Sequence, residues 1–178
     1  MNLYNYHNKP AELYNHKKAY TEVPMVLWST MSKRGNRNII RANKHIFAKD
    51  ARTAYSYAIR LRNGRFPEGE ATITKDAKYS FFYAKDIIKG EFPEGEDAIA
   101  TSGQYSVRYA SEVLDDVFEL GEDAIAKSAE YSFFYATGVI ESRFKKGEAA
   151  IAKSKFKGRY KRFLDDGYIV YGREHDFE

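Results

Sequence analysis

The residues with the clearest chemical potential in this chain are its two pairs of adjacent carboxylates, Asp115-Asp116 and Asp165-Asp166. Acid–base catalysis needs carboxylates in different environments, so that their proton affinities separate. Adjacent residues at a helix end point apart into water. Asp115-Asp116 also stands where earlier copies of a repeat, described below, end a helix. The sequence therefore favours a helix-end role for this pair over catalysis.

Metal, nucleophile and phosphate chemistry lack a motif in the sequence. The chain has no cysteine, which excludes disulfides, thiolate zinc sites and cysteine nucleophiles. Its histidines have no metal-ligand spacing, and no nucleophile elbow or Gly-Lys-Ser/Thr phosphate loop is present. The histidines are His7, His16, His45 and His175. We therefore predict a non-enzymatic protein without a metal ion or cofactor.

The elements that would position any functional residue recur along the chain. A Gly-Glu pair returns every 26 residues, and a Tyr-Ala pair keeps the same step. The glutamates are Glu70, Glu96, Glu122 and Glu148, and the tyrosines are Tyr57, Tyr83, Tyr109 and Tyr135. A fixed period of this length indicates a repeat array, in which each unit buries its apolar face against its neighbours.

Each copy predicts a short helix with an acidic start, followed by a longer helix of about 13 residues. The longer helix begins after an Asp or Ser, which are favoured N-caps. Gly64 and Gly90 are predicted left-handed C-caps, and Pro67 and Pro93 set the turn to the next short helix. The N-caps are Asp50, Asp76, Ser102, Ser128 and Ser154, and Phe66, Phe92, Phe118 and Phe144 are expected to fill the seams between copies.

The predicted fold is mainly α: an α-solenoid of about five two-helix repeats. Residues 1–43 carry no copy and are expected to form an N-terminal cap region, residues 44–165 the helical repeat array, and residues 166–178 a C-terminal tail. Within that tail, the β-like segment 168–171 is expected to be either a short strand or an extended cap. Ser80, Ser106 and Ser132 recur on the expected packing face, which makes them structural residues.

Three phrases of the sequence carry a resemblance: Arg65-Phe-Pro-Glu-Gly-Glu70, Asp97-Ala-Ile-Ala100 and Glu130-Tyr-Ser-Phe-Phe-Tyr-Ala136. Together they resemble a tandem helical repeat of bacteriophage proteins, most of them uncharacterised. The resemblance covers residues 45–153, although the later copies lose the proline. It implies a phage or phage-derived origin and carries over no catalytic residue and no defined activity. Small phage proteins often bind host factors, including defence proteins.

Two rows of tyrosines follow from the repeat, one helical turn apart. The rows are Tyr79, Tyr105 and Tyr131, and Tyr83, Tyr109 and Tyr135. One interpretation is packing between copies, with the hydroxyls reaching the surface. The other is an aromatic groove that binds a protein segment, because tyrosine is favoured at interfaces.

Charge is strongly segregated along the chain. Residues 1–65 sum to +10, residues 66–141 to −10 and residues 142–178 to +4. The acidic middle indicates a protein-binding surface or a mimic of nucleic acid, and blocks of opposite sign also permit self-association of opposite ends. The candidate acidic contacts are Glu94, Glu96, Asp97, Asp115, Asp116 and Glu119.

Two basic segments support an alternative, nucleic-acid binding, because Phe156 and Tyr160 are interleaved with cations in the second. The candidate contacts are Lys33, Arg34, Arg37 and Arg41 in the first segment, and Lys153, Lys155, Lys157, Arg159, Lys161 and Arg162 in the second.

The leading prediction is a protein-binding scaffold that inhibits a host defence protein. The sequence lacks a signal peptide pattern and a membrane-length apolar run. We therefore expect no membrane partner, and a location in the cytoplasm of an infected bacterial host.

Overall fold

The computed structural model describes residues 44–62 and 64–165, and the prediction of a mainly helical fold is confirmed for them. The described residues contain no strand. The chain divides into two compact units, residues 1–95 (unit 1) and 96–178 (unit 2). The predicted N-terminal cap, the first basic segment and the C-terminal tail lie outside the described residues.

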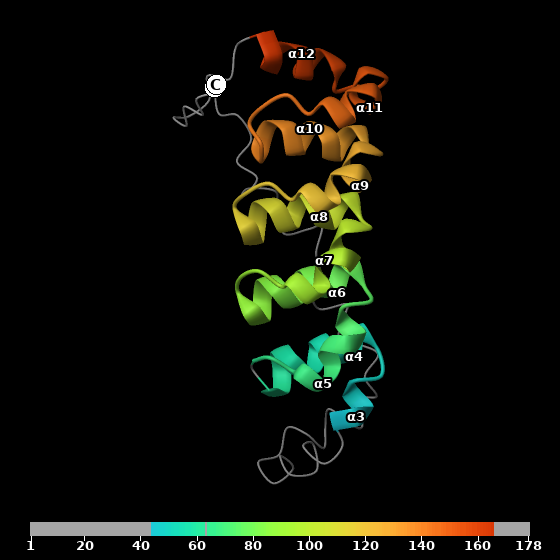
Figure 1. The fold of residues 1–178 in the computed structure, drawn as a ribbon, viewed down its shortest axis with the longest axis vertical. Coiled ribbons are helices and arrows are strands. Elements are labelled where there is room, and N and C mark those ends of the chain that lie inside the picture. Colours follow the sequence, from blue (N-terminus) through green and yellow to red (C-terminus); the bar gives the residue numbers. More distant parts are fainter. Residues whose placement is uncertain (1–43, 63, 166–178) are drawn as a thin grey trace. The chain divides into compact units, whose positions relative to one another are not determined.

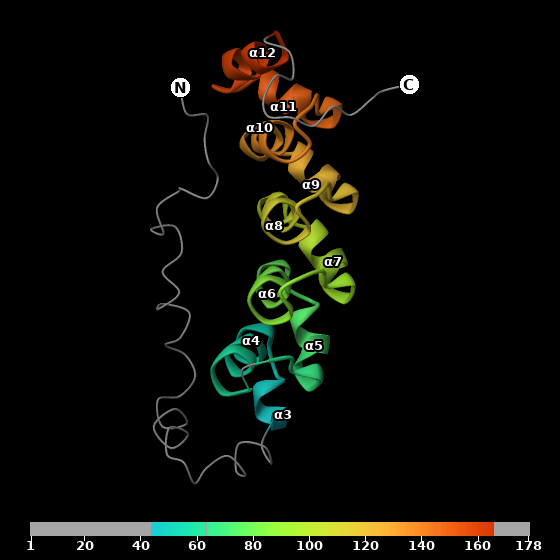
Figure 2. The same cartoon turned by 90° about the vertical axis from the view of Figure 1, so that its left-hand side faces the viewer.

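Unit 1 alternates short and long helices in two layers. Figure 2 shows α4 and α6 on one side of this unit and α3 and α5 on the other. The long helices α4 and α6 each continue into a π-helical segment, so both widen toward their C-terminal ends. The elements are α3 (Lys44–Phe47), α4 (Ala51–Tyr57), η4 (Ala58–Arg62), α5 (Pro67–Ile73), α6 (Ala77–Phe82) and η5 (Tyr83–Ile88); α7 (Pro93–Ala100) runs across the boundary into unit 2.

Unit 2 has the same alternation, with α8, α10 and α12 on one side and α9 and α11 on the other (Figures 1 and 2). Its long helix α8 also continues into a π-helical segment, whereas α10 remains α-helical throughout. The elements are α8 (Gly103–Tyr109), η6 (Ala110–Leu114), the 3₁₀ turn η7 (Glu119–Gly121), α9 (Glu122–Ala126), α10 (Ala129–Gly138), the 3₁₀ turn η8 (Lys145–Gly147), α11 (Glu148–Ala152) and α12 (Lys157–Asp165).

Four of the five predicted N-caps directly precede a long helix, whereas α12 begins at Lys157, three residues after the predicted cap Ser154. The side chains of Asp50, Asp76 and Ser128 accept hydrogen bonds from the backbone N–H three residues later, at 2.9, 3.0 and 3.4 Å. Ser102 stands at the N-cap of α8 but its side chain makes no capping hydrogen bond. The capping oxygen therefore defines the start of the long helix in three of these four copies.

The predicted C-caps are wrong. Gly64 and Gly90 are outside the left-handed region, and the left-handed residue after η5 is Lys89, with φ 60°. Asp115 and Glu141 occupy the same place in the next copies, with φ of 51° and 45°. The left-handed residue stands one position before Gly90 or its equivalent, both after the π-helical segments η5 and η6 and after the α-helical α10. Non-glycine residues therefore carry the strained conformation.

A close approach between the short and long helices fixes two small residues in every copy. A Cβ added to Gly121 would lie 2.5 Å from Ser106 Cβ and 2.7 Å from Phe118 Cδ1. Ser106 is fully buried, and its hydroxyl donates to the carbonyl oxygen of Ile99 at 3.1 Å. The same crowding joins Gly69 to Ala54, Gly95 to Ser80 and Gly147 to Ser132. The predicted packing role of these serines is thus confirmed.

Candidate protein-binding surface

Buried tyrosine hydroxyls hold each copy to the one before it. Tyr135 is fully buried; its hydroxyl accepts from the Phe118 N–H at 3.0 Å and donates to Glu122 at 3.5 Å. Burial is the main cause that raises the pKa of Tyr135 to about 12. In unit 1, Tyr83 makes the same two contacts, with the Phe66 N–H at 2.6 Å and Glu70 at 2.7 Å.

The last copy keeps this contact in a shifted register. Tyr160 is buried, and its hydroxyl accepts from the Phe144 N–H at 3.0 Å across 16 residues, where Tyr135 and Phe118 are 17 apart. The sequence therefore loses the exact period after Ser154, while the structure retains the hydrogen bond.

These contacts decide between the two interpretations of the tyrosine rows. Tyr83, Tyr109 and Tyr135 are fully buried, so they pack the interior and are not accessible to a partner. Glu96 is half-buried and accepts from the Tyr109 hydroxyl at 2.8 Å. The other row is half-buried: Tyr79, Tyr105 and Tyr131. Only this second row presents part of its rings to solvent.

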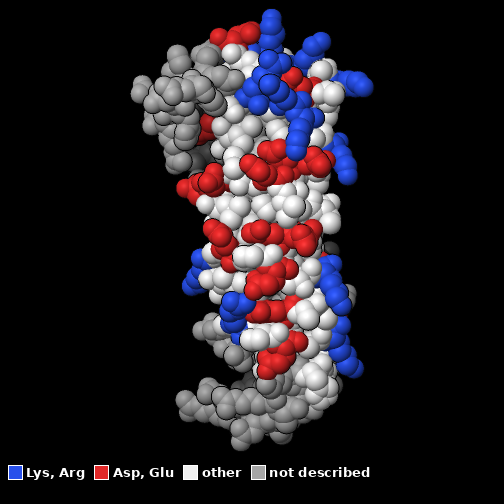
Figure 3. All heavy atoms as spheres, in the orientation of Figure 1, with Lys and Arg blue, Asp and Glu red and all other residues white. Residues whose placement is uncertain are grey.

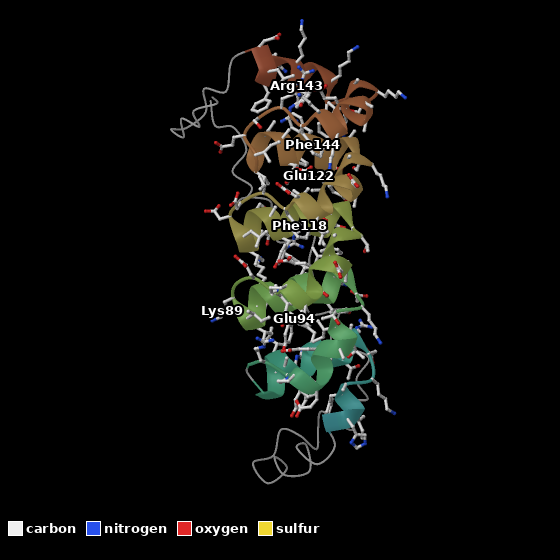
Figure 4. The ribbon with its side chains drawn as sticks, viewed as in Figure 1. Lys89, Glu94, Phe118, Glu122, Arg143 and Phe144 are labelled. Carbon is white, nitrogen blue, oxygen red and sulfur yellow. The ribbon has the colours of Figure 1, made fainter. Side chains whose placement is uncertain are left out.

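Arginine neutralises the repeated glutamate in two copies. Arg65 binds both oxygens of Glu70, at 2.8 and 2.9 Å, and Arg143 binds both oxygens of Glu148, at 2.5 and 3.0 Å. The hydrogen bond from Arg143 lowers the pKa of Glu148. In one of the two copies between them, Glu122 is instead paired with Lys146, whose Nζ lies 3.1 Å away. Figure 4 labels Arg143 and Glu122.

An exposed segment of unit 2 combines apolar and acidic side chains. Val117 is 42% exposed and Leu120 is 54% exposed, the large hydrophobic residues with the greatest exposure in the described part of the chain. Four exposed carboxylates surround them in the sequence: Asp115, Asp116, Glu119 and Asp123. We call residues 115–123 the 115–123 surface. Exposed apolar groups rimmed by polar ones are typical of protein interaction sites.

The backbone of the 115–123 surface is held in place by buried contacts. Phe118 is buried against the Tyr109 ring, with the centroids 5.1 Å apart, and its N–H is bound by Tyr135. The Asp116 N–H donates to the Ala110 carbonyl oxygen at 3.2 Å. These contacts fix the residues on either side of Val117, so its exposed side chain is presented from an ordered turn.

Sequence reasoning found the acidic residues Asp115, Asp116 and Glu119 but missed the two apolar ones. The signal was present in the repeat itself. Where Val117 stands, the other copies have Arg65, Glu91 and Arg143, and where Leu120 stands they have Glu68, Glu94 and Lys146. A loss of charge at two otherwise charged positions marks this copy as different. The remaining predicted acidic contacts, Glu94 and Asp97, are exposed.

The basic segment at the end of unit 2 forms α12 and the turn before it. Figure 3 shows Lys and Arg gathering at the α12 end of this unit and Asp and Glu over its earlier helices. Phe156 and Tyr160, the aromatic residues interleaved with these cations, are buried. Arg159 lies over the Phe133 ring, 4.9 Å from its centroid. The exposed cations are Lys153, Lys155, Lys157, Lys161 and Arg162.

Other chemistry finds little support in residues 44–165. Asp115 and Asp116 are both exposed, and Asp115 ends the helical segment η6, as predicted for a helix-end pair. Asp165 ends α12 and lies 3.8 Å from Lys161. No group of three His, Cys, Asp or Glu residues in this described part could hold a metal ion. His45 is exposed.

No helix in the described residues has the length and apolar character needed to cross a membrane. Comparison with family models, with curated proteins and with solved structures finds no match to this chain.

Proposed function

We propose that this chain is a protein-binding helical repeat scaffold, an α-solenoid of two-helix copies, that contacts its partner through the 115–123 surface. The observation that carries the proposal is the exposure of Val117 and Leu120 between carboxylates, on a turn anchored by buried Phe118. Burial of apolar side chains by a partner is favourable, with a free energy of roughly 25 cal/mol per Å² of apolar surface removed from water.

The recurring hydrogen bonds support a scaffold architecture. The same tyrosine hydroxyl contact recurs in both units, and repeat arrays use such neighbour contacts to build extended binding surfaces. Catalysis is not part of the proposal, because the four carboxylates that surround Val117 and Leu120 are all exposed, whereas acid–base catalysis needs carboxylates held in different environments.

The resemblance to bacteriophage repeats gives the proposal a biological setting. We place the protein in a phage-infected bacterial cell, where it inhibits a host factor by direct binding. Pure mimicry of nucleic acid would need only charge, whereas this surface includes two exposed apolar residues, Val117 and Leu120. The direct-contact form of inhibition therefore agrees better with the residues present.

Capture from bacterial lysate tests the proposal. The wild-type chain is compared with the double variant Val117→Glu, Leu120→Glu, which removes both apolar contacts and adds charge of the same sign as the rim. Ala149→Glu is the matched control, because it adds a carboxylate at an exposed position of the same unit. We expect a specific protein with wild type and the control, and its loss with the double variant.

Two outcomes would contradict the proposal. One is a folded wild-type chain that captures no protein. The other is a mobility shift of DNA or RNA at low salt that Lys157→Glu with Arg162→Glu abolishes, since a steep salt dependence and need for these cations indicate phosphate binding.

A further inference from the structure

A pair of carboxylates in unit 2 binds a lysine side chain. The Nζ of Lys146 lies 3.1 Å from Glu122 Oε2 and 3.1 Å from Asp123 Oδ1. Hydrogen bonds to these two carboxylates raise the pKa of Lys146. The last residue of one copy and the first residue of the next thus form a site for one ammonium group. In this copy, Lys146 of the same chain occupies the site.

Glu96 and Asp97 are the equivalent pair 26 residues earlier, also within unit 2. Glu122 accepts from the Tyr135 hydroxyl, and the Tyr135 ring lies 5.1 Å from the Phe144 ring. Lys146 then follows Phe144 by two residues, on the turn that Figure 4 marks by Phe144.

The same sequence of contacts starts from Glu96. It accepts from the Tyr109 hydroxyl, and the Tyr109 ring lies 5.1 Å from the Phe118 ring. The residue two positions after Phe118 is Leu120, not lysine. In the described part of the chain, no cation forms an ion pair with Glu96 or Asp97. This carboxylate pair therefore lacks the lysine that its successor has.

We propose that a lysine side chain of a protein partner fills this position, with its ammonium group between Glu96 and Asp97 and its methylene stem along Leu120. The proposal rests on the protein-binding function above and names the partner's contacting group. Lysine combines an apolar stem with a compact charged end, which matches an exposed leucine at the position equivalent to Lys146 and two carboxylates at the positions equivalent to Glu122 and Asp123.

The chain itself indicates lysine over arginine. Its arginines at equivalent turns bind one carboxylate through two nitrogens, as Arg143 does with Glu148. The shared site at Glu122 and Asp123 instead holds a single lysine nitrogen between two carboxylates. An ammonium group can serve both, because its three donors point in different directions.

A reciprocal exchange between the two copies tests the inference. Leu120→Lys gives the earlier pair the lysine of its successor, and Lys146→Leu empties the later pair. The probe is an acetylated and amidated Ala-Lys-Ala peptide, with the norleucine peptide as the uncharged control. Amide chemical shifts of the folded chain report binding, residue by residue, and a thermal melt checks that each variant is folded.

In the wild type we expect saturable shifts at Glu96, Asp97 and Leu120 that the norleucine peptide does not cause. Leu120→Lys should weaken this binding by about fivefold or more, and salt should weaken it too. Lys146→Leu should create a second set of shifts at Glu122 and Asp123. The absence of saturable shifts, or equal binding by Leu120→Lys, would overturn the inference.

The two proposals fail in different ways. If the chain binds the lysine peptide at Glu96 and Asp97 but captures no protein, the lysine site is supported and the proposed protein-binding function is contradicted. If a protein is captured and Leu120→Lys leaves its binding unchanged, the proposed function stands and the proposed lysine site is excluded.

Discussion

The buried hydroxyls of Tyr83 and Tyr135 each bind two groups of the preceding copy at once. The Tyr83 hydroxyl accepts from the buried Phe66 N–H and donates to Glu70. A buried N–H without a partner loses its hydrogen bonds to water and forms no replacement. The hydroxyl therefore contributes more to the free energy of folding than its packing alone would. This explains why the period preserves tyrosine where phenylalanine would fill the same space.

Removal of one such hydroxyl should be costly. Tyr83→Phe leaves the Phe66 N–H buried and unpaired, and we expect a loss of about 1–3 kcal/mol in the free energy of unfolding. Urea unfolding measures it. Tyr131→Phe is the control, because Tyr131 is half-buried and no hydrogen bond of its hydroxyl exists among the described residues. Equal effects of both changes would contradict this role.

At the residue scale, the left-handed positions are also places where a substitution should increase stability. Lys89 has φ 60°, a conformation that costs a residue with a Cβ more than it costs glycine. We expect Lys89→Gly to raise the free energy of unfolding by about 0.5–1 kcal/mol. Lys127→Gly, where φ is −69°, should lower it by a similar amount, so a thermal melt that showed the same sign for both would exclude the explanation.

At the scale of the elements, the close approach of short and long helices is the feature that the sequence explains best. Alternating helices, their N-caps and their packing faces follow from the period and from Asp and Ser at fixed places. The π-helical ends of α4, α6 and α8 were not predictable, because no local residue pattern distinguishes them from α-helix. The glycine C-caps were wrongly predicted because the left-handed residue precedes the glycine position, after the π-helical ends and after α10 alike.

The crowding at Gly121 predicts a strong response to a single methyl group. Gly121→Ala should lower the free energy of unfolding by about 1–3 kcal/mol, since its Cβ would overlap Ser106 and the Phe118 ring. Combining it with Ser106→Gly frees space, and a double-mutant cycle should show favourable coupling of about 0.5 kcal/mol or more.

Gly158→Ala is the matched control for that cycle, because its Cβ would meet no atom within 4 Å. It should be neutral or stabilising in the helix α12. A loss at Gly158 as large as that at Gly121 would show that the methyl group acts through something other than contact between helices.

The candidate site was partly predictable for a related reason. Acidic residues were visible as a charge block, but Val117 and Leu120 look ordinary in composition. Their importance depends on exposure, and exposure depends on Phe118 turning inward between them. In the same way, the interleaving of Phe156 and Tyr160 with cations did not reveal that both side chains are buried.

At the scale of the whole molecule, charge is unevenly distributed and its effects depend on pH. In unit 2, residues 96–130 hold nine Asp or Glu and two Lys or Arg, whereas residues 131–165 hold three and nine. One unit thus carries an acidic part and a basic part, and its binding should respond strongly to salt. Stability should change at both ends of the pH scale.

In alkali the buried tyrosines should control stability. The pKa of Tyr135 is raised by burial to about 12, above its ordinary value near 10. The stabilising contribution of the protonated hydroxyl is therefore complete below pH ~10 and is lost as the pH rises through about 12. We expect the midpoint of urea unfolding to fall in this range, and to fall less steeply in Tyr135→Phe.

In acid the arginine-bound glutamates should act in the opposite direction. The hydrogen bond from Arg143 lowers the pKa of Glu148 below its ordinary value. Its contribution is present above pH ~4.5 and is lost as the pH falls through the lowered folded pKa. Arg143→Met should flatten this acid dependence in a melting series, and an unchanged slope would contradict the assignment.

The tyrosine contact has a consequence for how such a chain can evolve. Because Tyr160 does for Phe144 what Tyr135 does for Phe118, excision of residues 123–148 would leave Tyr160 facing Phe118 and Glu122. Such a deletion removes one tyrosine together with one phenylalanine N–H, so the remaining Phe118 N–H still has a tyrosine hydroxyl as its partner. Recombination between the repeated segments of the gene can then lengthen or shorten the protein in whole copies. We therefore expect the number of copies to be the change in length that this fold tolerates best.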